Sequence, residues 1–226
     1  ARIIAGVDGT PRLAKGLDPG KDQSYFLYRM TREHLEQVLF PVGELVKPDV
    51  RAFAERIGIH VAEKPDSQET CFAPSGAYEK VVAARAPDAL EPGEIVDTEG
   101  NMLGYHTGLA RYTVGQRKGL GIGGAAEPWY VVGLDGASNR VIVGDPSQLS
   151  VTSVRATDVV WHGGPCEHVG AAVRYRMSAR AAIATVEDET LTVSFDEPLA
   201  GVAPGQSVVC YQGDIVIGGG VISCTS

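Results

Sequence analysis

One cysteine of this chain stands in a segment whose composition suits reactive chemistry. Cys71 follows the stretch Lys64-Pro65-Asp66-Ser67-Gln68-Glu69-Thr70, which is polar except for its proline. A structural cysteine usually sits in an apolar run, whereas loops on a rigid scaffold often carry reactive groups. A thiolate in such a loop can act as a nucleophile or accept a sulfur atom. The spacing alone leaves open both an inert cysteine and a working thiol.

Two short segments carry several cations and no acid, although the net charge of the chain is −8. That net charge argues against a protein that binds nucleic acid over its whole surface, but a local basic face can still contact phosphates. For the turn at residues 116–118, phosphate contact and simple solubility both remain open. The cations concerned are Arg174, Arg176 and Arg180 in residues 168–186, and Arg111, Arg117 and Lys118 in residues 111–118.

Four further features favour a structural interpretation over a functional one. The loop at residues 16–22 has its glycines one residue too close for a phosphate-binding loop, and an aspartate where a hydroxyl must reach a metal. The glycine-rich residues 119–124 lack the flanking strand and helix of a dinucleotide fingerprint, so we expect a flexible β connection or a bulge. His106 lies in a glycine-flanked turn. Residues 161–168 offer three soft ligands without the fourth that a tetrahedral site needs, so we expect no bound metal.

A helical segment is expected to position Cys71. Residues 1–17 predict a hairpin around an Asp8-Gly9 turn. Apolar periodicity predicts helices at about residues 23–30, 31–38, 48–57 and 75–85, which places Cys71 between the last two.

From Gly93 the apolar period changes to two, which predicts short strands and an antiparallel barrel. The expected strands are residues 94–97, 112–114, 129–134, 140–144, 156–161, 171–176, 181–186, 190–195, 207–211 and 214–217. The predicted fold class is therefore α+β, a helical segment followed by two antiparallel β domains, the last a β-barrel. We expect a helical domain at residues 1–90 that carries Cys71, a small β domain at 91–150 and the barrel at 151–226.

The composition is that of a soluble globular protein, with 44% hydrophobic and 21% charged residues in a chain of 226. No run approaches the roughly 20 apolar residues of a membrane span, and no secretory signal is visible. Four widely spaced cysteines then predict free thiols in a reducing cytoplasm. The chain opens inside a predicted strand, so we expect a piece of a longer protein.

Eight short motifs follow one another along the chain. They are Lys21-Asp22-Gln23-Ser24-Tyr25-Phe26-Leu27, Phe40-Pro41-Val42-Gly43, Lys47-Pro48-Asp49-Val50-Arg51, Asp66-Ser67-Gln68-Glu69-Thr70-Cys71-Phe72, Gly104-Tyr105-His106-Thr107-Gly108, Tyr112-Thr113-Val114-Gly115-Gln116-Arg117-Lys118-Gly119, Arg174-Tyr175-Arg176 and Pro204-Gly205-Gln206-Ser207. In this order they resemble bacterial tRNA-specific 2-thiouridylases. One motif would be weak, but eight in series cover essentially the whole chain.

The resemblance implies an enzyme that makes 2-thiouridine at the wobble position of certain tRNAs. In that family ATP, with Mg²⁺, adenylates the C2 oxygen of uridine, a cysteine persulfide supplies sulfur, and AMP leaves. The family fold is an N-terminal α/β ATP-pyrophosphatase domain, a small central β domain and a C-terminal β-barrel. The helical residues 1–90 would then be the tail of the first domain.

The resemblance also implies roles for individual residues. Cys71 matches the persulfide-bearing cysteine, with Lys64 and Lys21 as candidate cations that would lower its pKa. The residues that match tRNA contacts are Lys21, Asp22, Gln23, Arg174, Tyr175 and Gln206. The alternative for the triplet at 21–23 is a helix start capped by Asp22, and the alternative for Arg174 to Arg176 is a solvated edge strand.

Two parts of the family pattern do not occur in this chain. The Ser-Gly-Gly-Val-Asp-Ser type phosphate loop has no counterpart, nor does the first catalytic cysteine, since Cys166, Cys210 and Cys224 lie in the predicted β region. We therefore expect no ATP site in this chain and no activity from it alone. The expected partners are tRNA and a sulfur donor, either a cysteine desulfurase or a relay protein, for a monomer with no membrane association.

Two rival functions remain open from other classes. A non-catalytic RNA-binding module would use the barrels to hold RNA and would not need Cys71. A free-standing sulfur carrier would load Cys71 but would show no salt-dependent affinity for tRNA.

Overall fold

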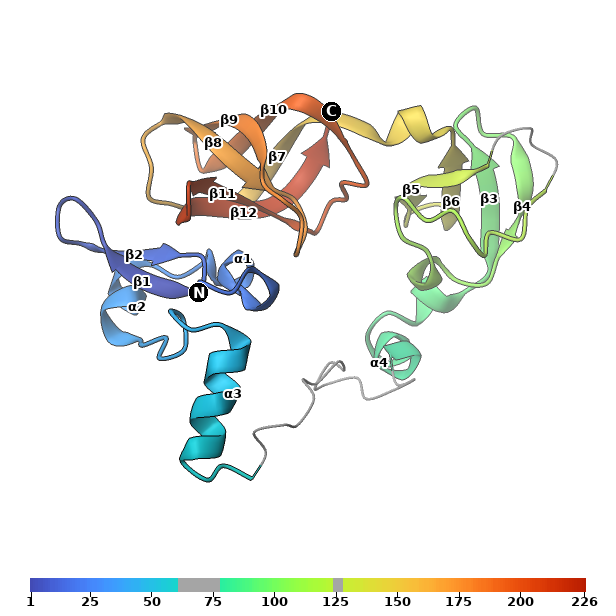
Figure 1. Ribbon diagram of the computed structural model, residues 1–226. Helices are drawn as coiled ribbons and strands as arrows, with labels where there is room; N and C mark the ends of the chain where they lie inside the picture. Colours follow the sequence, from blue (N-terminus) through green and yellow to red (C-terminus); the bar gives the residue numbers. More distant parts are fainter. Residues whose placement is uncertain (61–77, 124–127) are drawn as a thin grey trace. The chain divides into compact units, whose positions relative to one another are not determined.

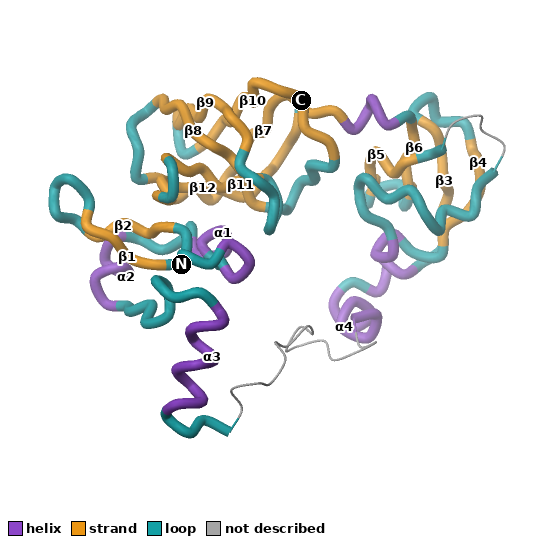
Figure 2. The backbone as a smooth tube through the Cα atoms, in the orientation of Figure 1, coloured by secondary structure: helices purple, strands orange, loops and turns teal. Residues whose placement is uncertain are grey.

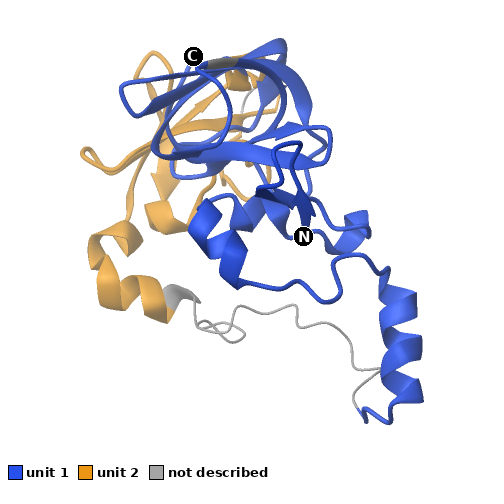
Figure 3. Cartoon of the chain, turned by 90° about the vertical axis from the view of Figure 1, so that its left-hand side faces the viewer, with its two compact units in different colours: residues 1–64, 151–226 blue, residues 65–150 orange. Residues whose placement is uncertain are grey.

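The computed structural model describes residues 1–60, 78–123 and 128–226, so Cys71 lies outside the described residues. The chain divides into two compact units, coloured separately in Figure 3. Unit 1 combines Ala1–Lys64 with Val151–Ser226, and unit 2 is Pro65–Ser150. The two ends of the sequence thus share one unit. The domain boundaries expected near residues 90 and 150 stay predictions.

A closed barrel of six antiparallel strands forms most of unit 1 (Figure 1). The strands run in the order β12-β11-β8-β9-β10-β7, and β12 also pairs with β7, which closes the ring. Apolar side chains alternate inward, as at Leu191, Val193 and Phe195, each of which is buried. The predicted barrel is confirmed. Its strands are β7 Ser150–Trp161, β8 Cys166–Ala172, β9 Arg180–Glu187, β10 Thr190–Ala200, β11 Ser207–Gln212 and β12 Ile215–Thr225.

A hairpin at the start of the chain joins this sheet. Strands β1, Arg2–Ala5, and β2, Pro11–Ala14, pair antiparallel as the Asp8-Gly9 turn predicts. Ala14 of β2 then pairs with Ile215 of β12. Because of this pairing, the residues that follow β2 lie at one end of the barrel.

Three helices follow the hairpin: α1 at Ser24–Leu27, α2 at Arg32–Gln37 and α3 at Lys47–Arg56. Tyr25, Tyr28 and Leu35 from the first two pack against Val209 and Tyr211 of β11 in one apolar cluster. Helix α3 buries none of its residues, although its apolar periodicity predicts an inward face.

Unit 2 is built on a sheet of four strands in the order β4-β3-β6-β5 (Figure 2). Strands β3 and β6 pair in parallel, so the prediction of a purely antiparallel small domain needs that correction. Its core contains Ile95, Val131 and Val141, all fully buried. The elements are α4 Tyr78–Arg85, β3 Gly93–Asp97, β4 Met102–His106, β5 Tyr130–Asp135 and β6 Arg140–Gly144.

Short 3-10 helices connect several elements: η1 Pro19–Lys21, η2 Pro87–Leu90, η3 Leu109–Arg111 and η4 Pro146–Leu149. Two strand predictions are wrong. Residues 112–114 form no strand, because the N–H of Thr113 bonds to the side chain of Gln116 instead of to a neighbouring strand. The strand predicted at 171–176 ends at Ala172, and the residues after it form a turn.

No helix among the described residues is long and apolar enough to cross a membrane.

Candidate functional site

A cleft of about 390 Å³ opens in unit 1 where residues 15–25 meet the barrel. Its barrel wall comes from the β8–β9 connection, residues 173–179, and from the β11–β12 turn. Its other wall comes from the segment between β2 and α1. The residues that matter for its chemistry are Arg2, Lys15, Asp22, Tyr25, Arg174, Tyr175, Arg176, Tyr211 and Asp214.

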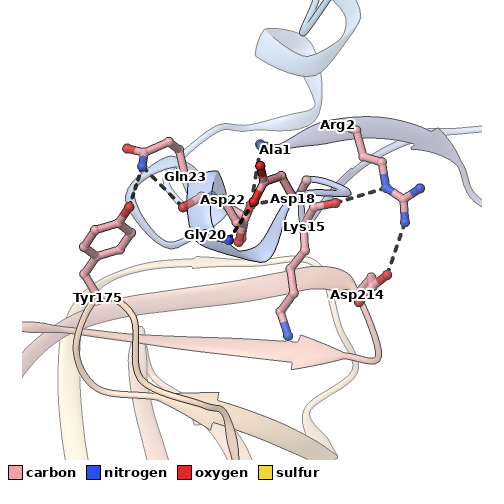
Figure 4. Close-up of polar contacts among 11 residues, drawn as sticks. Ala1, Arg2, Lys15, Asp18, Gly20, Asp22, Gln23, Tyr175 and Asp214 are labelled. Atoms are coloured by element: carbon pink, nitrogen blue, oxygen red, sulfur yellow. Dashed lines mark hydrogen bonds and ion pairs between the residues drawn. The ribbon is translucent and has the colours of Figure 1, made fainter. Parts of the chain in front are cut away.

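The two groups of residues that resemble tRNA contacts meet at this cleft. The Nε2 of Gln23 donates a hydrogen bond of 2.7 Å to the hydroxyl oxygen of Tyr175, across 152 positions of sequence (Figure 4). The ring of Tyr175 lies 4.6 Å from that of Phe26, centroid to centroid, and the Arg176 guanidinium lies 5.3 Å from the Tyr175 centroid. The tyrosine is thus held by a hydrogen bond, an aromatic neighbour and a cation while part of it stays exposed.

Asp22 is occupied with its own loop. Its carboxylate accepts hydrogen bonds from the N–H of Gly16 at 2.8 Å, from the N–H of Ser24 at 3.1 Å and from the Ser24 hydroxyl at 2.6 Å. Burial raises the pKa of this carboxyl, but the hydrogen bonds from Ser24 and Gly16 outweigh burial and hold the pKa below its ordinary value. The Asp22 carboxylate therefore holds residues 16–24 together through these hydrogen bonds, although the N-cap position of α1 is Gln23 and carries no side-chain capping hydrogen bond.

Cations line the mouth of the cleft. Arg174 and Arg176 are exposed, and neither forms an ion pair within the described residues. Lys15 places its Nζ 4.3 Å from the ring centroid of Tyr211. Arg2 bonds to the Lys15 carbonyl at 3.0 Å and to the Asp214 carboxylate at 3.2 Å. Such a group of guanidinium and ammonium ions suits phosphate oxygens.

The arginines of the β8–β9 connection lie on a hydrogen-bonded turn. The N–H of Met177 bonds to the carbonyl of Arg174 at 3.3 Å, which closes a turn. Arg176 has a φ of 63°, in the left-handed region that non-glycine residues seldom adopt. Arg174 and Tyr175 thus stand on a turn, and the edge-strand interpretation of residues 174–176 is wrong.

Buried tyrosines attach the helical wall of the cleft to the barrel. The hydroxyl of Tyr25 donates to the carbonyl of Ser207 at 2.8 Å, and the Ser207 hydroxyl bonds to Tyr28 at 3.3 Å. Burial raises the pKa of both Tyr25 and Tyr211 to about 12, so both phenols stay protonated near neutral pH. These phenols are structural anchors.

Three of the predicted site residues that the structure describes do not line this cleft, namely Lys21, Gln23 and Gln206. Lys21 is exposed at the end of η1, beside the triplet partners Asp22 and Gln23. Gln206 precedes β11, where its carbonyl accepts from Ile222 and its buried side-chain oxygen has no partner among the described residues. Cys71 lies outside the described residues. The roles of all these residues stay predictions.

Arg2, Lys15 and Phe26 belong to the site but were not expected there. Arg2 and Lys15 lie at the two open ends of the β1–β2 hairpin, since Arg2 pairs with Ala14 in the strand register. That juxtaposition follows from the hairpin itself. The contact of these residues with the barrel does not follow from the hairpin, because it depends on the pairing of Ala14 with Ile215.

The loop at residues 16–23 does not fit the phosphates of a bound ATP. The loop at residues 16–23 leads into helices of three and four residues, too short to offer a phosphate the aligned N–H groups of a helix start. Among the described residues, no three His, Cys, Asp or Glu side chains lie close enough together to hold a metal ion.

The structure shows how exposed two other cysteine thiols are, those of Cys210 and Cys224. Cys210 is fully buried in β11, and burial raises its pKa to about 12, so it remains a protonated thiol. Cys224 is exposed near the end of β12, and both are free.

Models of three protein-family domains match consecutive parts of the chain. They are described as the tRNA methyl transferase HUP domain for residues 1–75, the tRNA methyl transferase PRC-barrel domain for residues 79–145 and the aminomethyltransferase beta-barrel domain for residues 151–222. Together they cover nearly all of the sequence.

Curated relatives give a more specific name. The tRNA-specific 2-thiouridylases MnmA of Rhodospirillum centenum, Rhizorhabdus wittichii and Methylobacterium radiotolerans are 46%, 45% and 48% identical to this chain over 98%, 99% and 98% of it. The aligned region is 59%, 58% and 60% of those proteins, so the chain spans about three-fifths of their length. The chain belongs to the family of tRNA-specific 2-thiouridylases.

Proposed function

We propose that this chain provides the tRNA-holding and sulfur-delivering part of a tRNA-uridine 2-sulfurtransferase. The observation that carries the proposal is the hydrogen bond between Gln23 and Tyr175, since Tyr175 also lines the cleft with its cationic side chains. Two segments that separately resemble tRNA contacts of the family come together there. The partners are tRNA and a sulfur-donor protein, and the chain works in the cytoplasm as a monomer.

In this proposal the cleft binds an unpaired part of the tRNA. The ring of Tyr175 stacks on a base, and Gln23 hydrogen-bonds a base edge or ribose once the tyrosine hydroxyl releases it. Arg174, Arg176 and Lys15 pair with phosphates. Asp22 does not contact RNA but keeps Gln23 in place.

Cys71 accepts sulfur in this proposal. A donor persulfide gives its outer sulfur to the Cys71 thiolate, and the donor leaves as a thiolate. The outer sulfur of the resulting Cys71 persulfide attacks C2 of the adenylated uridine, and the C2 oxygen leaves with AMP. A second thiol of the whole enzyme then attacks the Cys71 sulfur, so that the S–S bond to the uridine breaks, 2-thiouridine is released and a disulfide with Cys71 forms. We assign the activation of the C2 oxygen by ATP to the whole enzyme.

The binding half of the proposal is tested by measuring the affinity of the full chain for unmodified tRNA. Tyr175→Ala is expected to weaken binding about 5- to 150-fold, because stacking a base on an aromatic ring contributes about 1–3 kcal/mol. Tyr175→Phe keeps the ring and should retain most of the affinity. Tyr105→Ala is the matched control, since Tyr105 is 71% exposed in unit 2. Equal affinities for wild type and Tyr175→Ala would contradict the proposal.

A further inference from the structure

A second basic surface lies in unit 2, on residues 113–121, here termed the basic turn. Hydrogen bonds hold it on both sides. The Gln116 side chain accepts from the N–H of Thr113 at 3.1 Å and donates to the carbonyl of Lys118 at 3.0 Å. The main chain of the turn pairs with β5 through Gly115 to Val131 at 2.7 Å and Val131 to Gln116 at 2.9 Å. Leu120, buried in the core of unit 2, anchors the far end. The turn is therefore held in place at both of its ends.

The backbone of the basic turn leaves donors open to solvent. Gly119 and Gly121 have φ values of +78° and +68°. The residue before each of them, Lys118 and Leu120 respectively, does not have a positive φ. A residue of negative φ followed by one of positive φ is the backbone pattern in which successive N–H groups can form an anion-binding concavity. Within the described residues, the N–H groups of Gly119 and Gly121 donate to no acceptor. The space beside the Cα of Gly121 is open to 4 Å.

Two cations flank these donors. Arg117 and Lys118 are exposed, and among the described residues neither forms an ion pair. No aspartate or glutamate occurs between Asn101 and Gly123. Unit 2 is acidic, yet its basic turn combines positive charges with N–H groups that have no acceptor in the described part of the chain. Solubility alone would not require such N–H groups to be held in place beside the cations.

We propose that the basic turn binds a backbone phosphate of tRNA. The phosphate oxygens accept from the N–H groups of Gly119 and Gly121 and pair with Arg117 and Lys118. An RNA chain is the ligand because the site is exposed and open, so a single small anion would gain little, whereas a polyanion also gains by releasing its counterions. This inference rests on the proposed function and adds a contact on a second unit.

The test compares how the tRNA affinity of full-chain variants depends on salt. Arg117→Ala combined with Lys118→Ala should lower the slope of log affinity against log salt by about 1 to 2, the amount expected for one or two lost phosphate contacts. Lys80→Ala combined with Arg85→Ala is the matched control, since both side chains are exposed on α4 of the same unit and the double variant also removes two positive charges. The control should keep the wild-type slope, and an equal change in both double variants would overturn the inference.

Tyr175→Ala in the same series separates the two proposals. If it weakens binding while the Arg117 and Lys118 variant behaves as wild type, the inference fails and the proposed function stands. If the wild-type chain shows no salt-dependent affinity for tRNA, both fail. The amide resonances of Gly119 and Gly121 should also shift on addition of tRNA, and shift less with inorganic phosphate at the same concentration. Unshifted resonances in the presence of tRNA would overturn the inference.

Discussion

At the scale of single residues, Asp22 determines the shape of the segment that carries Gln23. Three donors converge on its carboxylate from Gly16 and Ser24. Hydrogen bonds to an ionised acceptor are stronger than those between neutral groups, so this carboxylate stabilises the loop most when it is charged. The residue that resembles an RNA contact is thus the one that positions its neighbour.

Asp22→Asn is expected to lower the free energy of unfolding at pH 7 by about 1–3 kcal/mol, because an amide cannot replace the ionised acceptor. The folded-state pKa of Asp22 lies below its ordinary value of 3.8, so this stabilisation is fully present above that value and is lost as pH falls through the folded pKa. Urea unfolding between pH 7 and pH 3 measures the difference. It should shrink toward pH 3, and Asp196→Asn, at an exposed carboxylate of β10, should show little effect. A difference that stays constant with pH would contradict the account.

At the scale of elements, the short helix α1 depends on the barrel for its stability. Four residues are too few to form a stable helix alone. Tyr25 and Tyr28 fasten α1 to β11 through Ser207, and the ring of Tyr28 lies against Gly219 of β12. A side chain at position 219 would meet both that ring and the carbonyl of Val208. The absence of a side chain there lets α1 approach the sheet.

Gly219→Ala is therefore expected to lower the free energy of unfolding by about 1–3 kcal/mol through overpacking. It should also weaken tRNA binding, since α1 carries the residues beside Gln23. Gly136→Ala is the matched control, because nothing lies within 4 Å of the methyl group it would add. Thermal unfolding and tRNA titration of both variants measure these effects. Equal stability of the two variants would show that the close packing at Gly219 is unimportant.

Some elements could be predicted from the sequence because their signals are local. The Asp8-Gly9 turn predicts the first hairpin, and period-two runs such as 190–195 predict barrel strands. Strand β4 was not predicted, because Gly104 interrupts the alternation of apolar and polar residues along it. The turn at Arg174 was not predicted, because Ala171–Val173 continues the apolar pattern past the end of β8.

At the scale of the whole molecule, contacts between distant parts of the sequence create the candidate site. The pairing of Ala14 with Ile215 and the bond from Gln23 to Tyr175 join the first residues of the chain to the last third. No local pattern predicts either contact, because each depends on which surfaces meet after the chain has folded. The family resemblance pointed to both sets of residues, and the fold brings them into contact.

The sulfur-delivery role of Cys71 is the central claim for the whole protein, and peptide mapping by mass spectrometry tests it most directly. The full chain is incubated with a cysteine desulfurase and cysteine, and sulfur adducts are located on each of the four cysteines. The account predicts one added sulfur on Cys71, absent from Cys71→Ser, with the buried Cys210 unmodified because its thiol stays protonated. No adduct on Cys71, or an equal adduct on all four cysteines, would contradict the account and favour a non-catalytic RNA-binding module.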